Sequence, residues 1–295
     1  MTAADLARLV SLGALWGGSF AFMRVAVAGL GPLWLAETRV TLAFLALYAF
    51  ARMRRGVPAF RAHWREYAII GLVNTALPFA LFAWATQHAP ASVAAILNAT
   101  SPFFGAIVAA IWLRERITPI KLAGMAVGFS GVVLLVGWQS QQLDGDALLA
   151  VGACLAASLC YGIASVYART KLEGLSSFSI ALYSQMTAAA MLALALPFAP
   201  LPISISPLVV GNVTALALAS TAVAYLLYFR LIADLGPARA LTVTFLIPLF
   251  GVLWGWLFLG ERVGIDTLGA CALILCGTWL AVRQPARRSV PMPVD

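Results

Sequence analysis

The sequence has 295 residues, of which 62% are hydrophobic and only 10% are charged, and its formal net charge is +8. A soluble protein carries about 25% charged residues, because polar side chains must cover its surface. The composition excludes a soluble globular protein, a disordered chain, a coiled coil, collagen and a secreted disulfide scaffold. It predicts an all-α integral membrane protein. The cysteines lie in apolar stretches and are expected to be small buried side chains rather than disulfides or metal ligands: Cys154, Cys160, Cys271 and Cys276.

A helix needs about 20 apolar residues to cross a bilayer. Charged residues or glycine and proline separate the apolar stretches of this chain. The first stretch is expected to be a spanning helix and not a cleaved signal peptide, because it is long and has a counterpart in the second half. Ten stretches are predicted to span the membrane: 8–28, 33–51, 66–87, 92–113, 118–138, 146–168, 176–197, 208–231, 238–259 and 264–282.

The basic residues indicate the orientation. If the N-terminus is cytoplasmic and ten helices alternate, sixteen of the nineteen lysines and arginines lie on the cytoplasmic side. Arg262 alone lies on the other side, while Arg24 and Arg39 lie within helices. This asymmetry is what the positive-inside rule describes. We therefore expect both termini in the cytoplasm, and we attribute the net charge to topology, with no nucleic-acid partner.

The two halves of the chain resemble each other. SPFFGAIVAAIWLRERI at 101–117 matches IPLFGVLWGWLFLGERV at 247–263 without a gap, at an offset of 146 residues. Over 92–136 and 238–282, twelve of 45 positions are identical. Weaker matches pair Phe79 and Phe82 with Tyr225 and Tyr228, and Trp16-Gly17 with Tyr161-Gly162. The sequence therefore predicts an internal repeat.

Each half holds five predicted helices, so the second half enters the bilayer from the opposite side and the repeat is inverted. The predicted units are 1–140 and 141–285, followed by a short cytoplasmic tail at 286–295. Inverted repeats are typical of alternating-access transporters, because exchange of the two halves' conformations reverses the side to which the site opens.

These features resemble the EamA-type members of the drug/metabolite transporter superfamily. The resemblance rests on the ten helices, the two five-helix halves and the proline followed by Glu115-Arg116 and Glu261-Arg262 at the ends of the fourth and ninth helices. It covers residues 5–283. It implies an exporter of amino acids or other small metabolites, and the aromatic-rich interior is similar to that of the aromatic amino-acid exporters of the group.

A substrate site is expected near the bilayer midplane, between the halves. Polar residues deep in spanning helices are costly, so their positions are informative. Aromatic residues at repeat-related positions are suited to hold a ring or an apolar side chain. The predicted substrate-binding residues are Trp16, Ser19, Asn74, Pro78, Phe79, Phe82, Asn98, Ser101, Pro102, Tyr161, Ser165, Tyr225, Tyr228, Thr244 and Pro248.

Each of these residues has a structural alternative. Asn98 is equally suited to join two helices by hydrogen bonds. The prolines free backbone carbonyls, either for a substrate ammonium or simply as kinks. Aromatic stripes more often pack than bind, and Gly124-x-x-x-Gly128 is expected to pack within the molecule rather than at a dimer seam.

Five charged residues are predicted to act as gates or structural anchors: Arg24, Glu37, Arg39, Glu115 and Glu261. The first three are expected near the outer ends of the first two helices, where they snorkel or form a mutual ion pair. The alternatives are a role in an external gate or in attracting a carboxylate. Each glutamate of the Glu-Arg pairs is expected to contact another element, as a loop anchor or a gate latch.

The predicted function is export of small amphiphilic metabolites, foremost neutral or aromatic amino acids, across the inner membrane by a monomer or weak homodimer. The central thirds of the predicted helices carry no Asp, Glu or His, which favours facilitated transport over proton coupling. No nucleotide loop, cofactor motif or metal-ligand cluster is present. The alternatives are proton-driven export of a purine, a sugar or a toxic amphiphile and, more remotely, a channel, while an enzyme lacks a nucleophile with a base.

Overall fold

The computed structural model describes residues 2–54, 56, 59–139, 145–235 and 240–282. These residues form helices and the connections between them, and no strand occurs among them. Several predictions lie outside these residues: the tail 286–295, the Gly236-Pro237 break, and the positions of Arg55, Arg239, Arg283, Arg287 and Arg288.

The helices follow the predicted apolar stretches closely. Their bounds are α1 Ala3–Leu30, α2 Pro32–Met53, α3 Trp64–Gly71, α4 Leu77–His88, α5 Ala91–Asn98, α6 Ser101–Trp112, α7 Pro119–Gln139, α8 Gly145–Lys171, α9 Ser177–Ala195, α10 Pro207–Ala217, α11 Ala224–Leu235, α13 Leu246–Leu259 and α14 Ile265–Val282. Single turns of 3₁₀ helix lie at Arg61–His63 and Leu196–Phe198, and a longer one at Leu241–Phe245. Two segments of π-helix, η2 at Leu72–Ala76 and η4 at Leu218–Val223, join α3 to α4 and α10 to α11.

Eight helical runs among the described residues are long and apolar enough to cross a membrane. Two shorter apolar helices, Pro119–Leu135 and Ile265–Ala281, overlap the predicted spans 118–138 and 264–282. The chain is therefore a multi-pass membrane protein, and the count of ten spans stays a prediction.

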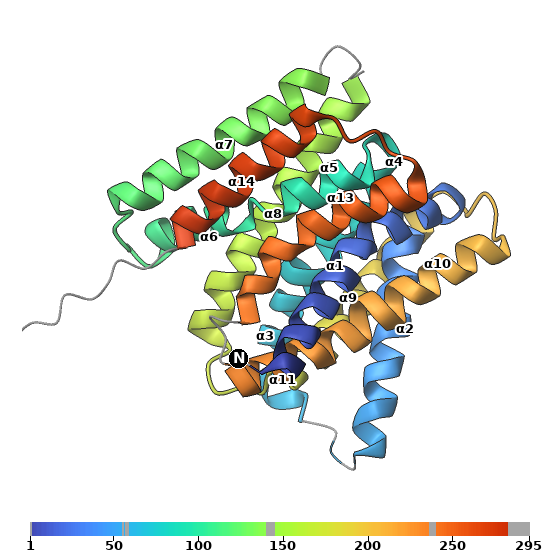
Figure 1. Ribbon diagram of the computed structural model, residues 1–295. Helices are drawn as coiled ribbons and strands as arrows, with labels where there is room; N and C mark the ends of the chain where they lie inside the picture. Colours follow the sequence, from blue (N-terminus) through green and yellow to red (C-terminus); the bar gives the residue numbers. More distant parts are fainter. Residues whose placement is uncertain (1, 55, 57–58, 140–144, 236–239, 283–295) are drawn as a thin grey trace, which may run out of the picture.

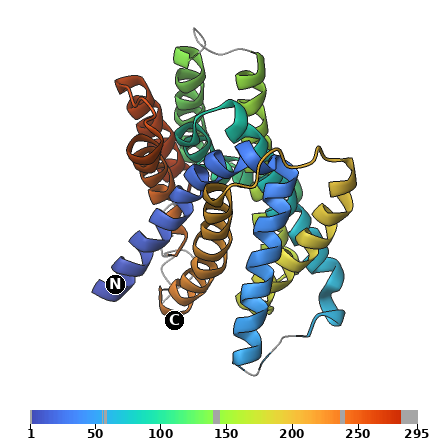
Figure 2. The same ribbon diagram turned by 90° about the vertical axis from the view of Figure 1, so that its right-hand side faces the viewer.

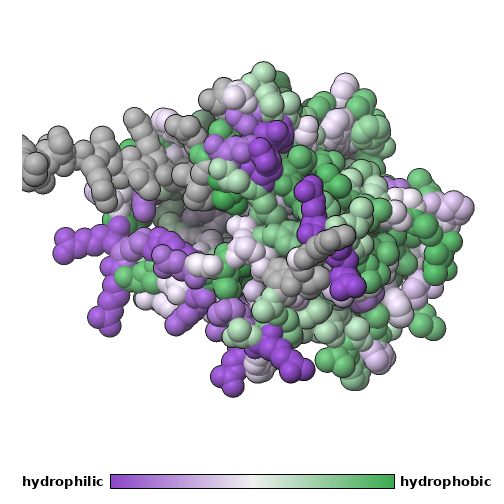
Figure 3. Space-filling view, turned by 90° about the horizontal axis from the view of Figure 1, so that it is seen from below, coloured by the Kyte–Doolittle hydropathy of each residue, from purple (hydrophilic) through white to green (hydrophobic). Residues whose placement is uncertain are grey.

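The helices cross the molecule between two opposite faces (Figures 1 and 2). The N-terminal face holds the start of α1 and the ends of α2, α8 and α11. The exposed basic residues Arg52, Arg54, Arg61, Arg65, Arg169, Lys171 and Arg230 belong to it, and hydrophilic side chains gather where the molecule is seen from this side (Figure 3). On the opposite face, the backbone amides of Ile203 and Ser204 donate to the Gly29 carbonyl at 2.9 and 3.2 Å.

Glycines of the repeated motifs allow two close helix crossings. A Cβ atom on Gly17 of α1 would lie 2.7 Å from the Ile247 carbonyl oxygen and 2.8 Å from the Gly251 nitrogen of α13. A Cβ on Gly162 of α8 would lie 2.7 Å from the Gly105 nitrogen of α6. Small residues permit such backbone approach in membrane helices. The first helix of each predicted half thus packs against the fourth helix of the other half.

The helices α7 and α14 pack side by side at one edge of the molecule (Figure 1). A Cβ on Gly124 would lie 2.7 Å from both the Gly277 oxygen and the Ala281 nitrogen. The ring of Phe103 covers Gly128. The glycine motif of α7 therefore packs within the molecule, as the sequence predicts.

Candidate functional site

Six aromatic side chains from α1, α4, α8 and α11 lie in two groups of three contacting rings, and Trp16 and Phe20, one turn apart on α1, link the groups. We call this set the central aromatic cluster: Trp16, Phe20, Phe82, Tyr161, Tyr225 and Tyr228. The ring centroid of Trp16 lies 6.4 Å from that of Tyr225 and 5.3 Å from that of Tyr228. Phe82 lies 5.3 Å from Phe20 and stacks on Tyr161 at 6.1 Å. The cluster joins both predicted halves of the chain and contains five of the aromatic residues predicted from the repeat.

Two π-helical segments flank this cluster at positions related by the repeat offset. The extra residue in each π turn breaks the regular i−4 pattern, and such turns are common at functional sites. In η4 the Thr221 hydroxyl donates to the Leu216 carbonyl at 2.9 Å, five residues earlier. Asn74 lies in η2 and is half-buried. Pro78, two residues after the end of η2, lacks the N–H that would bond the Asn74 carbonyl.

The fourth predicted span is broken between α5 and α6. Pro102 near the start of α6 has no N–H for the Asn98 carbonyl, and that carbonyl accepts from the Ser101 hydroxyl at 2.7 Å. Hydroxyls from two other helices also bond carbonyls at this break. Ser158 of α8 donates to Leu97 at 3.1 Å, and Thr278 of α14 donates to Ala99 at 2.9 Å. The break is thus a fixed structural feature stabilised from two sides.

Other predicted polar residues bond within their own helices. The Ser19 hydroxyl donates to the Trp16 carbonyl at 2.6 Å, and the Ser165 hydroxyl donates to the Gly162 carbonyl at 2.8 Å. Thr244 is half-buried in the 3₁₀ turn before α13, and Pro248 is buried within α13. The hydroxyls of Ser19 and Ser165 are therefore bonded to their own helices rather than presented to a ligand.

The prediction for the first three charged residues is wrong in one respect, because the described residues show no ion pair among them. Arg24 donates to the Thr86 carbonyl at the end of α4, and Glu37 accepts from the Thr41 hydroxyl at 2.6 Å. Arg39 does not snorkel, since it is 5% exposed and its guanidinium lies over the Phe79 ring, with Cζ 3.6 Å from the centroid. Its Nε donates to the Thr221 hydroxyl at 3.0 Å. One helical turn separates Glu37 from Thr41, so the glutamate is satisfied locally while the arginine turns inward.

The two repeat-related glutamates contact different partners. Glu261 on the opposite face caps the start of α5, accepting from the Ala91 amide at 2.6 Å and the Ser92 amide at 3.0 Å. A carboxylate at a helix N-terminus is stabilised by the free amides and the helix dipole. Glu115 on the N-terminal face pairs with Arg169 at 2.5 Å, with both side chains about half exposed. Both contacts join the predicted halves. The Glu261 contact is a partly buried helix cap, and the Glu115 contact is an ion pair exposed to solvent.

We expect Glu261→Gln to lower the free energy of unfolding by about 1–2 kcal/mol, because it removes the negative charge from the capped helix start. Glu115→Gln is the matched control on the repeat-related residue. It is expected to change stability by less than about 1 kcal/mol, since exposed ion pairs contribute little. Thermal unfolding of the two purified variants in one detergent checks this difference, and equal shifts would show that Glu261 does not act as a cap.

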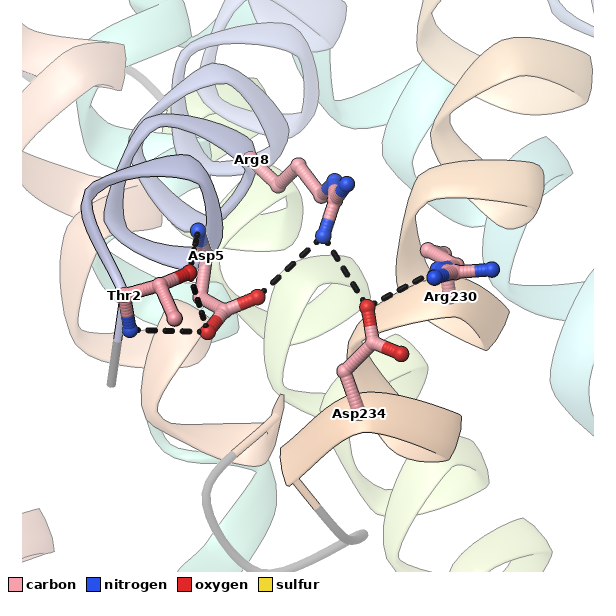
Figure 4. Close-up of polar contacts among 5 residues, drawn as sticks. All are labelled: Thr2, Asp5, Arg8, Arg230 and Asp234. Atoms are coloured by element: carbon pink, nitrogen blue, oxygen red, sulfur yellow. Dashed lines mark hydrogen bonds and ion pairs between the residues drawn. The ribbon is translucent and has the colours of Figure 1, made fainter.

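A network of charged side chains lies on the N-terminal face (Figure 4). No sequence motif predicted this network. Arg8 of α1 pairs with Asp5 at 3.2 Å and with Asp234 of α11 at 2.9 Å. Arg230 also pairs with Asp234, at 2.8 Å. The network joins α1 of the first predicted half to α11 of the second, at the face opposite the Glu261 cap. Its sequence signal is only the i, i+3 and i, i+4 spacing of opposite charges.

The model of the EamA-like transporter family matches the chain twice, over residues 7–137 and 148–283. The chain belongs to the EamA-like transporter family. The resemblance inferred from the Glu-Arg and Pro-x-Phe-Gly motifs is thereby confirmed.

Curated relatives of this family member match over nearly their full lengths. It is 22% identical to the uncharacterized transporter YoaV of Bacillus subtilis, over 96% of this chain and 98% of the relative. It is 27% identical to a probable terminal-alkyne amino-acid exporter of Streptantibioticus cattleyicolor, over 92% and 91%. It is also 27% identical to an S-adenosylmethionine/S-adenosylhomocysteine transporter of Chlamydia muridarum, over 93% and 90%.

A solved crystal structure shares the fold, with a TM-score of 0.66 and 20% identity over 96% of this chain and 97% of that one. The family and the named relatives are transporters, so this multi-pass membrane protein is a transporter and not an enzyme. Its substrate is a small molecule that crosses the membrane.

Proposed function

We propose that this transporter exports small amphiphilic metabolites, foremost neutral and aromatic amino acids, by alternating access at the central aromatic cluster. The main observation that supports this proposal is that Trp16 from the first half contacts Tyr225 and Tyr228 from the second half in the interior. Aromatic rings from two halves suit an apolar or aromatic side chain. The name of the relative from Streptantibioticus cattleyicolor, an amino-acid exporter, supports the same substrate class.

Two inverted five-helix halves, 1–140 and 141–285, provide the mechanism in this proposal. Three observations support it: the family model matches twice, the glycine crossings α1–α13 and α8–α6 are related by the repeat, and both π segments recur at an offset of 146. Rocking of one half against the other would expose the cluster to each side in turn. The Arg8–Asp234 and Glu261 contacts join the halves at opposite faces, so the two are expected to open alternately.

The ten spans and the cytoplasmic termini belong to the same proposal. The described basic residues gather on the N-terminal face, and Arg24 and Arg262 belong to the opposite end of the molecule. The positive-inside rule then places the N-terminal face in the cytoplasm and the protein in the inner membrane.

We further propose facilitated transport rather than proton coupling. A proton relay needs a titratable side chain in the membrane interior. Glu37 lies within α2 and is half-buried, and the Thr41 hydroxyl donates to its carboxylate. Glu37 forms no ion pair among the described residues. The acidic residues that do form ion pairs there lie at or beside helix ends: Asp5, Glu115, Asp146 and Asp234.

Uptake of radiolabelled aromatic and aliphatic amino acids into proteoliposomes that contain the purified chain tests the function. We expect saturable uptake that is stimulated by unlabelled substrate inside and does not respond to a pH gradient. Accumulation driven by the gradient would replace facilitated transport by proton antiport and make Glu37 the first residue to mutate. Absence of uptake for every amino acid would contradict the substrate class, and uptake without saturation would indicate a channel.

A further inference from the structure

Arg39 is a charged side chain in the interior of a membrane protein. It is 5% exposed and sits on α2 between the Phe79 ring, 3.6 Å from the guanidinium carbon, and the Thr221 hydroxyl, which accepts from Nε at 3.0 Å. Nη1 lies 3.7 Å from the sulfur of Met23. All three partners are uncharged.

No acidic side chain among the described residues pairs with this guanidinium. The ion pairs of the described chain involve Asp5, Glu115, Asp146 and Asp234, all at helix ends. The titratable groups that interact with Arg39 electrostatically are the hydroxyls of Tyr161 and Tyr225. A cation in a membrane interior is costly and is normally paired with an anion. Arg39 is therefore a buried cation without the anionic partner that such a residue normally has.

The guanidinium retains donors for an anion. The hydrogen bonds of the described residues use Nε and Nη1, and Nη2 has no partner there. A guanidinium presents parallel N–H groups that match the two oxygens of a carboxylate, in charge-assisted bonds about twice as strong as neutral ones. Nη2 of Arg39 thus offers N–H donors and a positive charge to one carboxylate, and the weak contact of Nη1 with sulfur can be exchanged for the second oxygen.

The interior of the molecule holds further unused polar atoms. Among the described residues, the buried hydroxyls of Thr75 and Ser220, in the two π segments, have no hydrogen-bond partner, nor do the amide nitrogen and oxygen of buried Gln185. Buried polar groups without a partner are rare and call for an explanation such as a ligand. Ser220 is adjacent to Thr221, the residue that Arg39 bonds.

We propose that Arg39 binds the carboxylate of the transported molecule, whose apolar part contacts the central aromatic cluster. The inference rests on the proposed transport function and narrows its substrate to carboxylate-bearing amphiphiles. Met23, which Arg39 contacts, packs in the same hydrophobic core as Phe20 and Phe82 of the cluster. A ligand bound at Arg39 would therefore have rings of the cluster beside it. Among the roles predicted for Arg39 from the sequence, the proposal favours attraction of a carboxylate over a structural anchor.

The second half has no arginine at the position related to Arg39 by the repeat, so the site is asymmetric. At the offset of 146 that relates Phe79 to Tyr225, Arg39 corresponds to Gln185 and Thr221 corresponds to Thr75. At the offset of 145 that relates Trp16 to Tyr161, Arg39 corresponds to Ser184. With either offset, the first half supplies a cation where the second half supplies a neutral side chain. Carboxylate recognition is expected from Arg39 alone, and exchange of the two side chains offers a direct test.

Competition against labelled L-phenylalanine uptake, in proteoliposomes, compares carboxylates with their own amides: L-phenylalanine with L-phenylalaninamide, and 3-phenylpropionate with 3-phenylpropionamide. For wild type we expect each carboxylate to compete about tenfold or more better than its amide, as a charge-assisted bond predicts. Arg39→Gln should abolish this ratio, Arg39→Lys should reduce it, and adding Gln185→Arg to Arg39→Gln should restore part of it. Arg24→Gln, which changes an arginine bonded to a backbone carbonyl, should keep the ratio.

An unchanged ratio in Arg39→Gln would overturn the proposal and make Arg39 a packing residue. If Arg39→Gln does not fold, an unchanged ratio in Arg39→Lys has the same meaning. Wild type that takes up neutral amides but none of the carboxylates would also overturn it, while leaving the transporter in place. Wild type that transports nothing in the panel would contradict the proposed function together with this inference.

Discussion

Gly162→Leu is expected to prevent the assembly of the folded protein. A Cβ atom at this position of α8 would lie 2.7 Å from the Gly105 nitrogen and 2.8 Å from the Phe104 carbonyl carbon of α6. Backbone atoms cannot move aside as side chains do, so the two helices would have to separate. Overpacking costs about 1–3 kcal/mol where side chains can adjust, and more is expected where a backbone blocks the site. The measurement is the yield of monodisperse protein in detergent and its melting temperature.

Gly152→Leu is the control on the same helix, because no atom lies within 4 Å of a Cβ built at Gly152. Replacing a helical glycine without a clash is neutral or favours the helix by up to about 1 kcal/mol. Gly152→Leu should therefore express and melt like wild type. Equal yields of the two variants would show that the α6–α8 crossing is not as close as described.

Trp16→Ala is expected to reduce uptake of labelled L-phenylalanine by about tenfold or more, mainly through a higher KM. Its ring contacts Tyr225 and Tyr228 across the predicted halves, and losing about 1.4 kcal/mol of ligand contact already corresponds to tenfold in affinity. The repeat-related change Tyr161→Ala should act in the same direction, because it removes the stacking partner of Phe82.

Trp112→Ala is the matched control, since Trp112 of α6 is 49% exposed on the molecular surface. It should leave the KM unchanged. Unaltered uptake in Trp16→Ala, Tyr161→Ala and Asn98→Ala together would show that the substrate site lies elsewhere in the molecule.

The fold was largely predictable because hydropathy and sequence self-similarity report on it directly. Long apolar stretches must form helices in a bilayer, and the described helices follow the predicted stretches. The Gly124-x-x-x-Gly128 motif predicted packing within the molecule, and the structure shows Gly124 against α14. The π segments were not predictable, because they result from a shift of backbone hydrogen bonds around Thr75 and Thr221 rather than from a distinctive composition.

The candidate site was predictable in its residue types more than in its contacts. The repeat pointed to Trp16, Tyr161 and Tyr225, which the structure brings into one region. It did not reveal whether Arg39 turns to the membrane surface or inward, because snorkelling and burial produce the same sequence pattern. The network of Arg8, Asp5 and Asp234 was equally hidden, since its partners are 226 residues apart.

The central claim is that two inverted halves open at opposite faces in turn. One spin-label pair is placed at positions 6 and 233 on the N-terminal face, and another at positions 87 and 265 on the opposite face. In each pair the two labels sit on different predicted halves, at exposed positions. Distance distributions are measured in a chain whose four cysteines are replaced by alanine, with Glu261 intact and with Glu261→Gln. We predict that loss of the Glu261 cap lengthens the 87–265 distance and shortens the 6–233 distance. A change at one face only, or lengthening at both, would contradict alternating access.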